Sequence, residues 1–173
     1  MEKDRSAFTV KSLEYKNGVF FNDTLLKLRI DRIDEIDGNF FIIDYKSGIS
    51  SKNDWQRTPL TSIQLPLYSL VMNEEIIGFA NAQVRSNQHK FVGLSKDKRF
   101  PGDVISEKSW SVLRESWHTE IANLIDAFKV GESSLTVNST KHFHYHDYLI
   151  PLNRFYESLM NSEYSEVGTG HDE

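Results

Sequence analysis

Hydrophobic and polar positions alternate along the first part of the chain in a pattern that predicts β-strands. Residues 8–15 and 19–36 are rich in β-branched and aromatic residues, and the turn-forming Lys16-Asn17-Gly18 separates them. A third strand is predicted at residues 39–46, where an apolar run leads into charged positions. Asp37-Gly38 precedes this strand and favours a two-residue hairpin turn, because both turn positions need positive φ.

A helix is predicted after these strands. Residues 47–59 are polar and rich in turn formers, which indicates a loop. Residues 61–72 follow with a helical pattern that Thr61 or Ser62 could cap. Pro66 fits this helix only if it falls within the first turn.

The second half of the chain predicts a strand pair and a long helix. Residues 78–84 and 90–94 read as strands, and the helix begins near Ser106 and ends at Gly131. Apolar residues recur along it at spacings of three and four and are expected to face the core: Trp110, Leu113, Trp117, Ile121, Leu124, Ile125 and Phe128. Together the elements predict an α/β fold, with a mixed central sheet and helices on both faces.

The hairpin at Asp37-Gly38 brings charged residues together. With a two-residue turn, Asp31 lies opposite Asp44, and strand alternation places Lys46 on the same face. Moving the turn by one residue pairs Asp31 with Lys46 and keeps the three together, whereas a three-residue loop would place Asp31 on the other face.

This group of residues has two interpretations. Two neighbouring carboxylates repel each other, and a hard cation such as Mg²⁺ or Mn²⁺ would relieve that repulsion, with the main-chain carbonyl of Tyr45 as a further ligand. Lys46 could then orient a water or stabilise charge on a phosphate. The alternative is an exposed ladder of ion pairs with little consequence. The apolar Ile42-Ile43 favours a buried strand and therefore a site.

Composition narrows the functional classes. The 173-residue chain has no cysteine, which excludes disulfides and a cysteine-ligated iron–sulfur cluster within it. No apolar stretch reaches the length of a membrane span, and the N-terminus lacks the apolar region of a signal peptide, so a cytoplasmic protein is expected. The net charge of −5 means that DNA binding would need a local basic patch or bound cations.

The strings LRIDRIDEIDGNFFIIDYKSG and QLPLYSL resemble the RecB-family branch of the PD-(D/E)xK nucleases. The similarity is close to the C-terminal domain of predicted AddB-like DNA repair exonucleases. It implies a restriction-endonuclease-like core in which Asp31 and Asp44 bind the metal ion and Lys46 is the catalytic lysine. Gln64 and Tyr68 match the family's Q-x-x-x-Y motif and complete the implied catalytic set.

Two departures from that family stand out. Many relatives hold an iron–sulfur cluster with four cysteines. Because this chain has no cysteine, no such cluster is expected here. Relatives also often carry a histidine or glutamate on a helix ahead of the first strand. The nearest upstream acid here is Glu14, which is predicted to lie on a strand and could be a ligand or a solvent-facing residue. His142, His144 and His146 could bind a transition metal or simply belong to an aromatic-rich closing segment.

The sequence therefore predicts a Mg²⁺- or Mn²⁺-dependent deoxyribonuclease, exonucleolytic and active in DNA repair or recombination. The alternative is a catalytically inactive nuclease-fold module that binds DNA or docks to a helicase partner. A single domain is expected over residues 1–161, as part of a larger protein, with a polar tail at 162–173. DNA and a helicase subunit or domain are the expected partners. No association with a membrane is expected. The sequence leaves open the cleavage polarity and the activity of the isolated domain.

Overall fold

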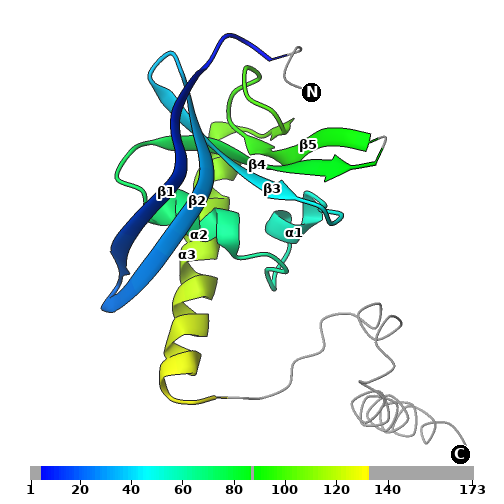
Figure 1. Ribbon diagram of the computed structural model, residues 1–173. Helices are drawn as coiled ribbons and strands as arrows, with labels where there is room; N and C mark the ends of the chain where they lie inside the picture. The colour runs from blue at the N-terminus through cyan, green and yellow to red at the C-terminus, as the bar shows by residue number, and fades with distance from the viewer. Residues whose placement is uncertain (1–4, 87, 133–173) are drawn as a thin grey trace, which may run out of the picture. The chain divides into compact units, whose positions relative to one another are not determined.

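A single mixed β-sheet organises the described part of the chain. The computed structural model describes residues 5–86 and 88–132, and residues Met1–Ser133 form one compact unit (Figure 1). Strands are hydrogen-bonded in the order β1-β2-β3-β4-β5-β6, with parallel pairing at β3–β4 and β5–β6 and antiparallel pairing elsewhere. The strands are β1 (Thr9–Phe21), β2 (Thr24–Ile36), β3 (Asn39–Lys46), β4 (Ile76–Arg85), β5 (Gln88–Ser95) and β6 (Asp103–Val104).

The β2–β3 hairpin has the register that the sequence predicts. Asp37 and Gly38 both have positive φ, at 52° and 76°, as a two-residue turn of this kind requires. Ile36 pairs with Asn39, and the pairing continues to Arg32 opposite Ile43. The turn therefore fixes which residues of β2 and β3 share a face.

The predicted turn at Lys16-Asn17-Gly18 is wrong. β1 continues through these residues, which pair with Arg29, Leu28 and Lys27, and the turn falls at Asn22-Asp23. Phe21, the last residue of β1, is buried, with its ring 4.9 Å from that of His118 on α3 (Glu107–Lys129). Burial of an aromatic side chain stabilises the longer hairpin by about 2 kcal/mol, which outweighs the local turn preference of Gly18.

The first two helices are short. α1 (Asn53–Gln56) lies within the segment predicted as a loop, and α2 (Gln64–Val71) follows it. Neither Thr61 nor Ser62 caps α2, because the helix begins at Gln64 and its N-cap, Ile63, makes no side-chain hydrogen bond. Pro66 is the third helical residue, and so it falls within the first turn as predicted.

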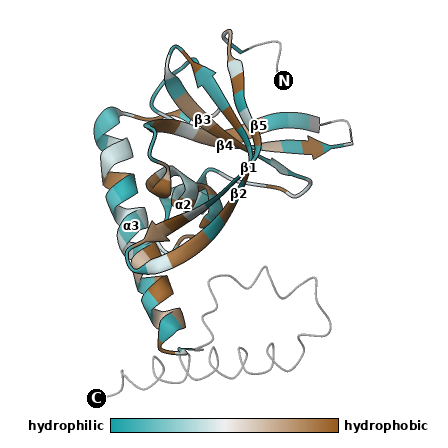
Figure 2. Cartoon of the chain, turned by 60° about the vertical axis from the view of Figure 1, so that its left-hand side comes forward, coloured by the Kyte–Doolittle hydropathy of each residue, from teal (hydrophilic) through white to brown (hydrophobic). Residues whose placement is uncertain are grey.

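The long helix α3 confirms the predicted start and end. Ser106 Oγ accepts a hydrogen bond from the backbone N–H of Ser109, and Gly131 follows the helix with φ of 73°. Trp110, Trp117 and Ile121 are buried as predicted, but Leu124 and Phe128 are 49% and 83% exposed, so the prediction is wrong for these two residues. Figure 2 shows hydrophobic and hydrophilic residues mixed along α3.

The core has two layers, one on each face of the sheet. Ile42 and Phe79 centre the first layer, to which all three helices contribute through residues such as Trp55, Leu65 and Trp117. The second layer contains no helical residue among those described; its buried members are Ile36, Phe41, Ile43, Ile77, Ala80, Ala82 and Phe100. The α/β fold with a mixed sheet is confirmed, while the helix expected on the second face is not among the described residues.

Two further predictions concern residues 133–173. The boundary at residue 161 and the histidines at 142, 144 and 146 lie outside the described residues and stay predictions. In the part of the chain that the structure describes, no helix is long and apolar enough to cross a membrane.

Candidate functional site

The site begins where the β2–β3 pairing ends. Asp31 lies one residue beyond the last pair, Arg32 with Ile43, and its Oδ2 accepts a hydrogen bond of 2.9 Å from the backbone N–H of Tyr45. A carboxylate thus replaces a main-chain carbonyl as the partner of β3. The side chain of Asp31 is therefore held against the strand that carries Asp44.

Asp44 is a buried carboxylate on β3, with only 2% of its surface exposed. Burial raises the pKa of the Asp44 carboxyl above its ordinary value, and the nearby negative charge of Asp31 acts in the same direction. The hydrogen bond and charge of Lys46, whose Nζ lies 2.6 Å from Asp44 Oδ2, oppose this rise. Asp44 is thus held among one like charge and one opposite charge, as the predicted hairpin requires.

Gln64 connects the charged residues to α2. Its Nε2 donates to Asp44 Oδ1 at 2.9 Å, and its Oε1 accepts from Lys46 Nζ at 2.8 Å. The same Nε2 lies 3.1 Å from the hydroxyl of Tyr68, one helical turn further on, and this hydroxyl donates to the carbonyl of Arg29 at 2.7 Å. One amide therefore contacts both ends of the Asp44–Lys46 ion pair, and Tyr68 fixes that amide to β2.

The donor atoms fit a hard divalent cation. Asp44 Oδ2 is buried beside the ammonium of Lys46, and it is a carboxylate oxygen of the kind that Mg²⁺ prefers. No cluster of three or more His, Cys, Asp and Glu side chains occurs within residues 5–86 and 88–132. Mg²⁺ does not require one, since one or two carboxylates with waters and phosphate oxygens complete its six ligands.

The main chain of Tyr45 faces β2. Its phenol ring is exposed, and the hydroxyl accepts a hydrogen bond of 3.2 Å from Arg32. In a strand, the N–H and C=O of one residue point toward the same neighbour. The N–H of Tyr45 faces Asp31, so its carbonyl lies on the side of β3 that faces β2.

Two other acidic residues form ion pairs outside the group of Asp31, Asp44 and Lys46. Glu14 is 62% exposed at its side chain and pairs with Arg29 at 2.8 Å, which favours the solvent-facing role that the sequence left open. Asp34 is fully buried on the other face, where Arg32 donates to both its oxygens at 2.6 and 3.0 Å. This ion pair explains the second aspartate of the IDRID string as a structural residue.

Sequence reasoning missed two buried amides beside the site. Asn81 is opposite Asp44 in the parallel β3–β4 register, and Gln83 is opposite Lys46. Both are buried, and both contact Ser50, in the loop that follows β3. The signal was present as polar residues alternating with apolar ones in an otherwise hydrophobic strand.

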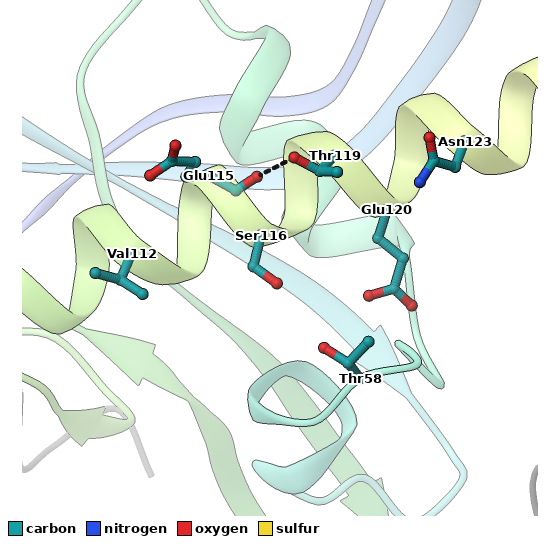
Figure 3. A pocket seen from close by; sticks show the side chains of 7 residues that line it. All are labelled: Thr58, Val112, Glu115, Ser116, Thr119, Glu120 and Asn123. Carbon is teal, nitrogen blue, oxygen red and sulfur yellow. Dashed lines mark hydrogen bonds between the residues drawn. The ribbon is translucent and has the colours of Figure 1, made fainter.

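A pocket of about 430 Å³ lies elsewhere, against α3 (Figure 3). It contains none of the predicted site residues; its lining is Thr58, Val112, Glu115, Ser116, Thr119, Glu120 and Asn123. Glu120 accepts a hydrogen bond from the backbone N–H of Leu60, so part of this acidic lining joins the helix to the loop before α2.

The sheet is mixed, and its β2–β3 hairpin carries two neighbouring aspartates and a lysine. The family model of the PD-(D/E)XK nuclease superfamily matches residues 1–140, and the chain belongs to this superfamily. Its members are generally nucleases and typically use divalent metal ions.

The comparisons with curated proteins and with solved structures add no further family assignment. No curated protein matches the chain. Among solved structures, the crystal structure of SSO0001 is similar with 16% identity and a TM-score of 0.32, over 65% of this chain and 50% of that one. The chain thus spans half the length of that protein.

Proposed function

We propose that this chain is the nuclease domain of a RecB- or AddB-like protein that degrades DNA from its ends during repair or recombination. The observation that carries the proposal is the contact of Gln64 with both Asp44 and Lys46, beside Asp31. The three charged residues have the types and the order of a nuclease metal site.

Each residue has a distinct role in this proposal. Asp31 and Asp44, with the carbonyl of Tyr45, hold Mg²⁺ or Mn²⁺, which supplies an activated water and charge stabilisation at the phosphate. Lys46 is 40% exposed at its side chain, so its ammonium can reach a phosphate in solvent while it stays beside Asp44.

Gln64 and Tyr68 act on these charged residues. The amide of Gln64 keeps Lys46 and Asp44 at fixed separation, which limits the motion of the ammonium. Tyr68 prevents rotation of that amide through its own bond to the carbonyl of Arg29.

The assignment to the repair branch rests on sequence similarity. The IDRID and IDYKSG strings, followed by QLPLYSL, resemble the RecB-type nucleases. We further propose that the domain extends over residues 1–161 of a larger protein and acts with a helicase subunit or domain. The absence of cysteine leads us to propose a nuclease without an iron–sulfur cluster.

A nuclease-fold module that binds DNA without cutting it is the alternative. An inactive site has no need to keep Asp44 charged and buried, because an unrelieved buried carboxylate lowers stability. The intact contacts of Asp44 with Lys46 and Gln64 favour the catalytic proposal.

A cleavage assay tests the proposal. Labelled linear DNA, single- and double-stranded, and a closed circular DNA are incubated with the protein in Mg²⁺, Mn²⁺ or EDTA. Asp44→Asn is compared with Asp23→Asn, which replaces an exposed aspartate paired with Lys129 at the far end of the β1–β2 hairpin.

The expected result is metal-dependent loss of linear DNA that Asp44→Asn abolishes and Asp23→Asn does not. Cutting of the circular DNA would contradict the exonucleolytic part. DNA binding without cleavage under either metal would favour the inactive module.

A further inference from the structure

Asn81 and Gln83 extend the polar face of the sheet onto β4. Directly opposite residues share a face, so Asn81 lies beside Asp44 and Gln83 beside Lys46. The face otherwise continues into the apolar first layer of the core, since Phe79, two residues before Asn81, belongs to it. Polar amides at such positions require hydrogen-bond partners.

Gln83 has a structural partner. Its Nε2 donates to the main-chain carbonyl of Ser50 at 3.3 Å, which ties the loop after Lys46 to β4. This bond involves only the backbone of Ser50, so it does not depend on the serine side chain.

Asn81 is incompletely satisfied. It is 4% exposed, and its Nδ2 donates to Ser50 Oγ at 2.8 Å, but its Oδ1 is buried with no hydrogen-bond partner among the described residues. The oxygen end of the Asn81 amide therefore lacks a hydrogen-bond partner among the described residues.

Leaving a buried amide group unsatisfied carries a free-energy cost. A ligand at the Asp31–Asp44 position would remove that cost. A hydrated divalent cation there brings water molecules whose hydrogen atoms point away from the ion, and these can donate to a carboxamide oxygen.

We propose that Asn81 is a positioning residue for the metal ion, whose side-chain oxygen accepts a hydrogen bond from a water of the ion's hydration shell. Asn81 acts through that water and does not touch the ion. The inference rests on the proposed metal site of Asp31 and Asp44.

Mn²⁺ binding without DNA tests the inference, with free Mn²⁺ measured by electron paramagnetic resonance. The proteins compared are the full chain, Asp44→Asn, Asn81→Ala and Ser50→Ala. Ser50→Ala is the matched control, because it removes the serine hydroxyl bound by Asn81 while Gln83 still holds the loop. Circular dichroism confirms folding, and Asn81→Thr, which suits a strand, replaces the alanine variant if that one does not fold.

The expected result is a Mn²⁺ affinity about ten-fold weaker in Asn81→Ala and unchanged in Ser50→Ala. Equal losses in both variants would mean that Asn81 only holds the loop, and would overturn the inference. An unchanged Asn81 variant, with binding still lost in Asp44→Asn, would overturn the inference and leave the proposed function intact. Equal binding by the full chain and Asp44→Asn would overturn both.

Discussion

Replacing Gln64 by leucine isolates the contact that joins Lys46 to Asp44. The substitution keeps the approximate size of the side chain and removes the bonds of 2.8 and 2.9 Å to the two charged groups. A hydrogen bond to a charged group contributes about 1.5–3 kcal/mol. Lys46 and Asp44 keep their direct contact at 2.6 Å, so we expect the equivalent of one such bond to be lost in the transition state.

That loss corresponds to a decrease in kcat of roughly ten- to 150-fold, at about 1.4 kcal/mol for each factor of ten. Single-turnover cleavage of labelled linear DNA in saturating Mg²⁺ measures it. Gln64→Glu is the companion variant, since it keeps an acceptor for Lys46 but places a carboxylate against Asp44. A folded Gln64→Leu protein that cleaves within two-fold of the unchanged chain would refute the proposed role of this amide.

Three other outcomes are expected. Asp44→Asn raises the melting temperature of the metal-free protein at neutral pH, because burial raises the folded-state pKa of Asp44 and its charged carboxylate therefore lowers stability above that pKa. The gain in melting temperature disappears below about pH 3.8, where the carboxyl is protonated in the folded and unfolded states, so melting in EDTA at neutral pH and below pH 3.8 measures it. Tyr68→Phe destabilises the fold by about 1–3 kcal/mol in urea unfolding, because the Arg29 carbonyl loses its donor; an unchanged midpoint would contradict this. Trp117→Ala lowers the free energy of unfolding by about 3–5 kcal/mol in the same assay, and Trp117→Phe lowers it much less, because the phenyl ring still fills most of the space beside Phe79. Equal losses of stability in the two variants would point instead to the hydrogen bond from Trp117 Nε1 to the Trp55 carbonyl.

The part of the fold that the sequence predicted best depends on local chemistry. Asp37-Gly38 admits few turn conformations, so the hairpin register and the approach of Asp31 to Asp44 followed from sequence alone. The start of α3 was equally local, because Ser106 caps it directly.

The errors arose where distant residues determine the local structure. Gly18 was predicted to end a strand, but β1 continues because Phe21 packs against His118, which is far away in sequence. The position of Asn81 opposite Asp44 was equally hidden, since it depends on the parallel β3–β4 register, and no local turn specifies that register.

The group formed by Asp31, Asp44, Lys46, Gln64 and Tyr68 comes from one continuous stretch of chain, which ends before β4 begins. Short loops cost little entropy to close, so contacts within such a stretch form quickly during folding. On the ribosome this stretch emerges before α3, which supplies Trp117 to the first layer of the core. The charged residues can therefore meet before the hydrophobic layer is complete.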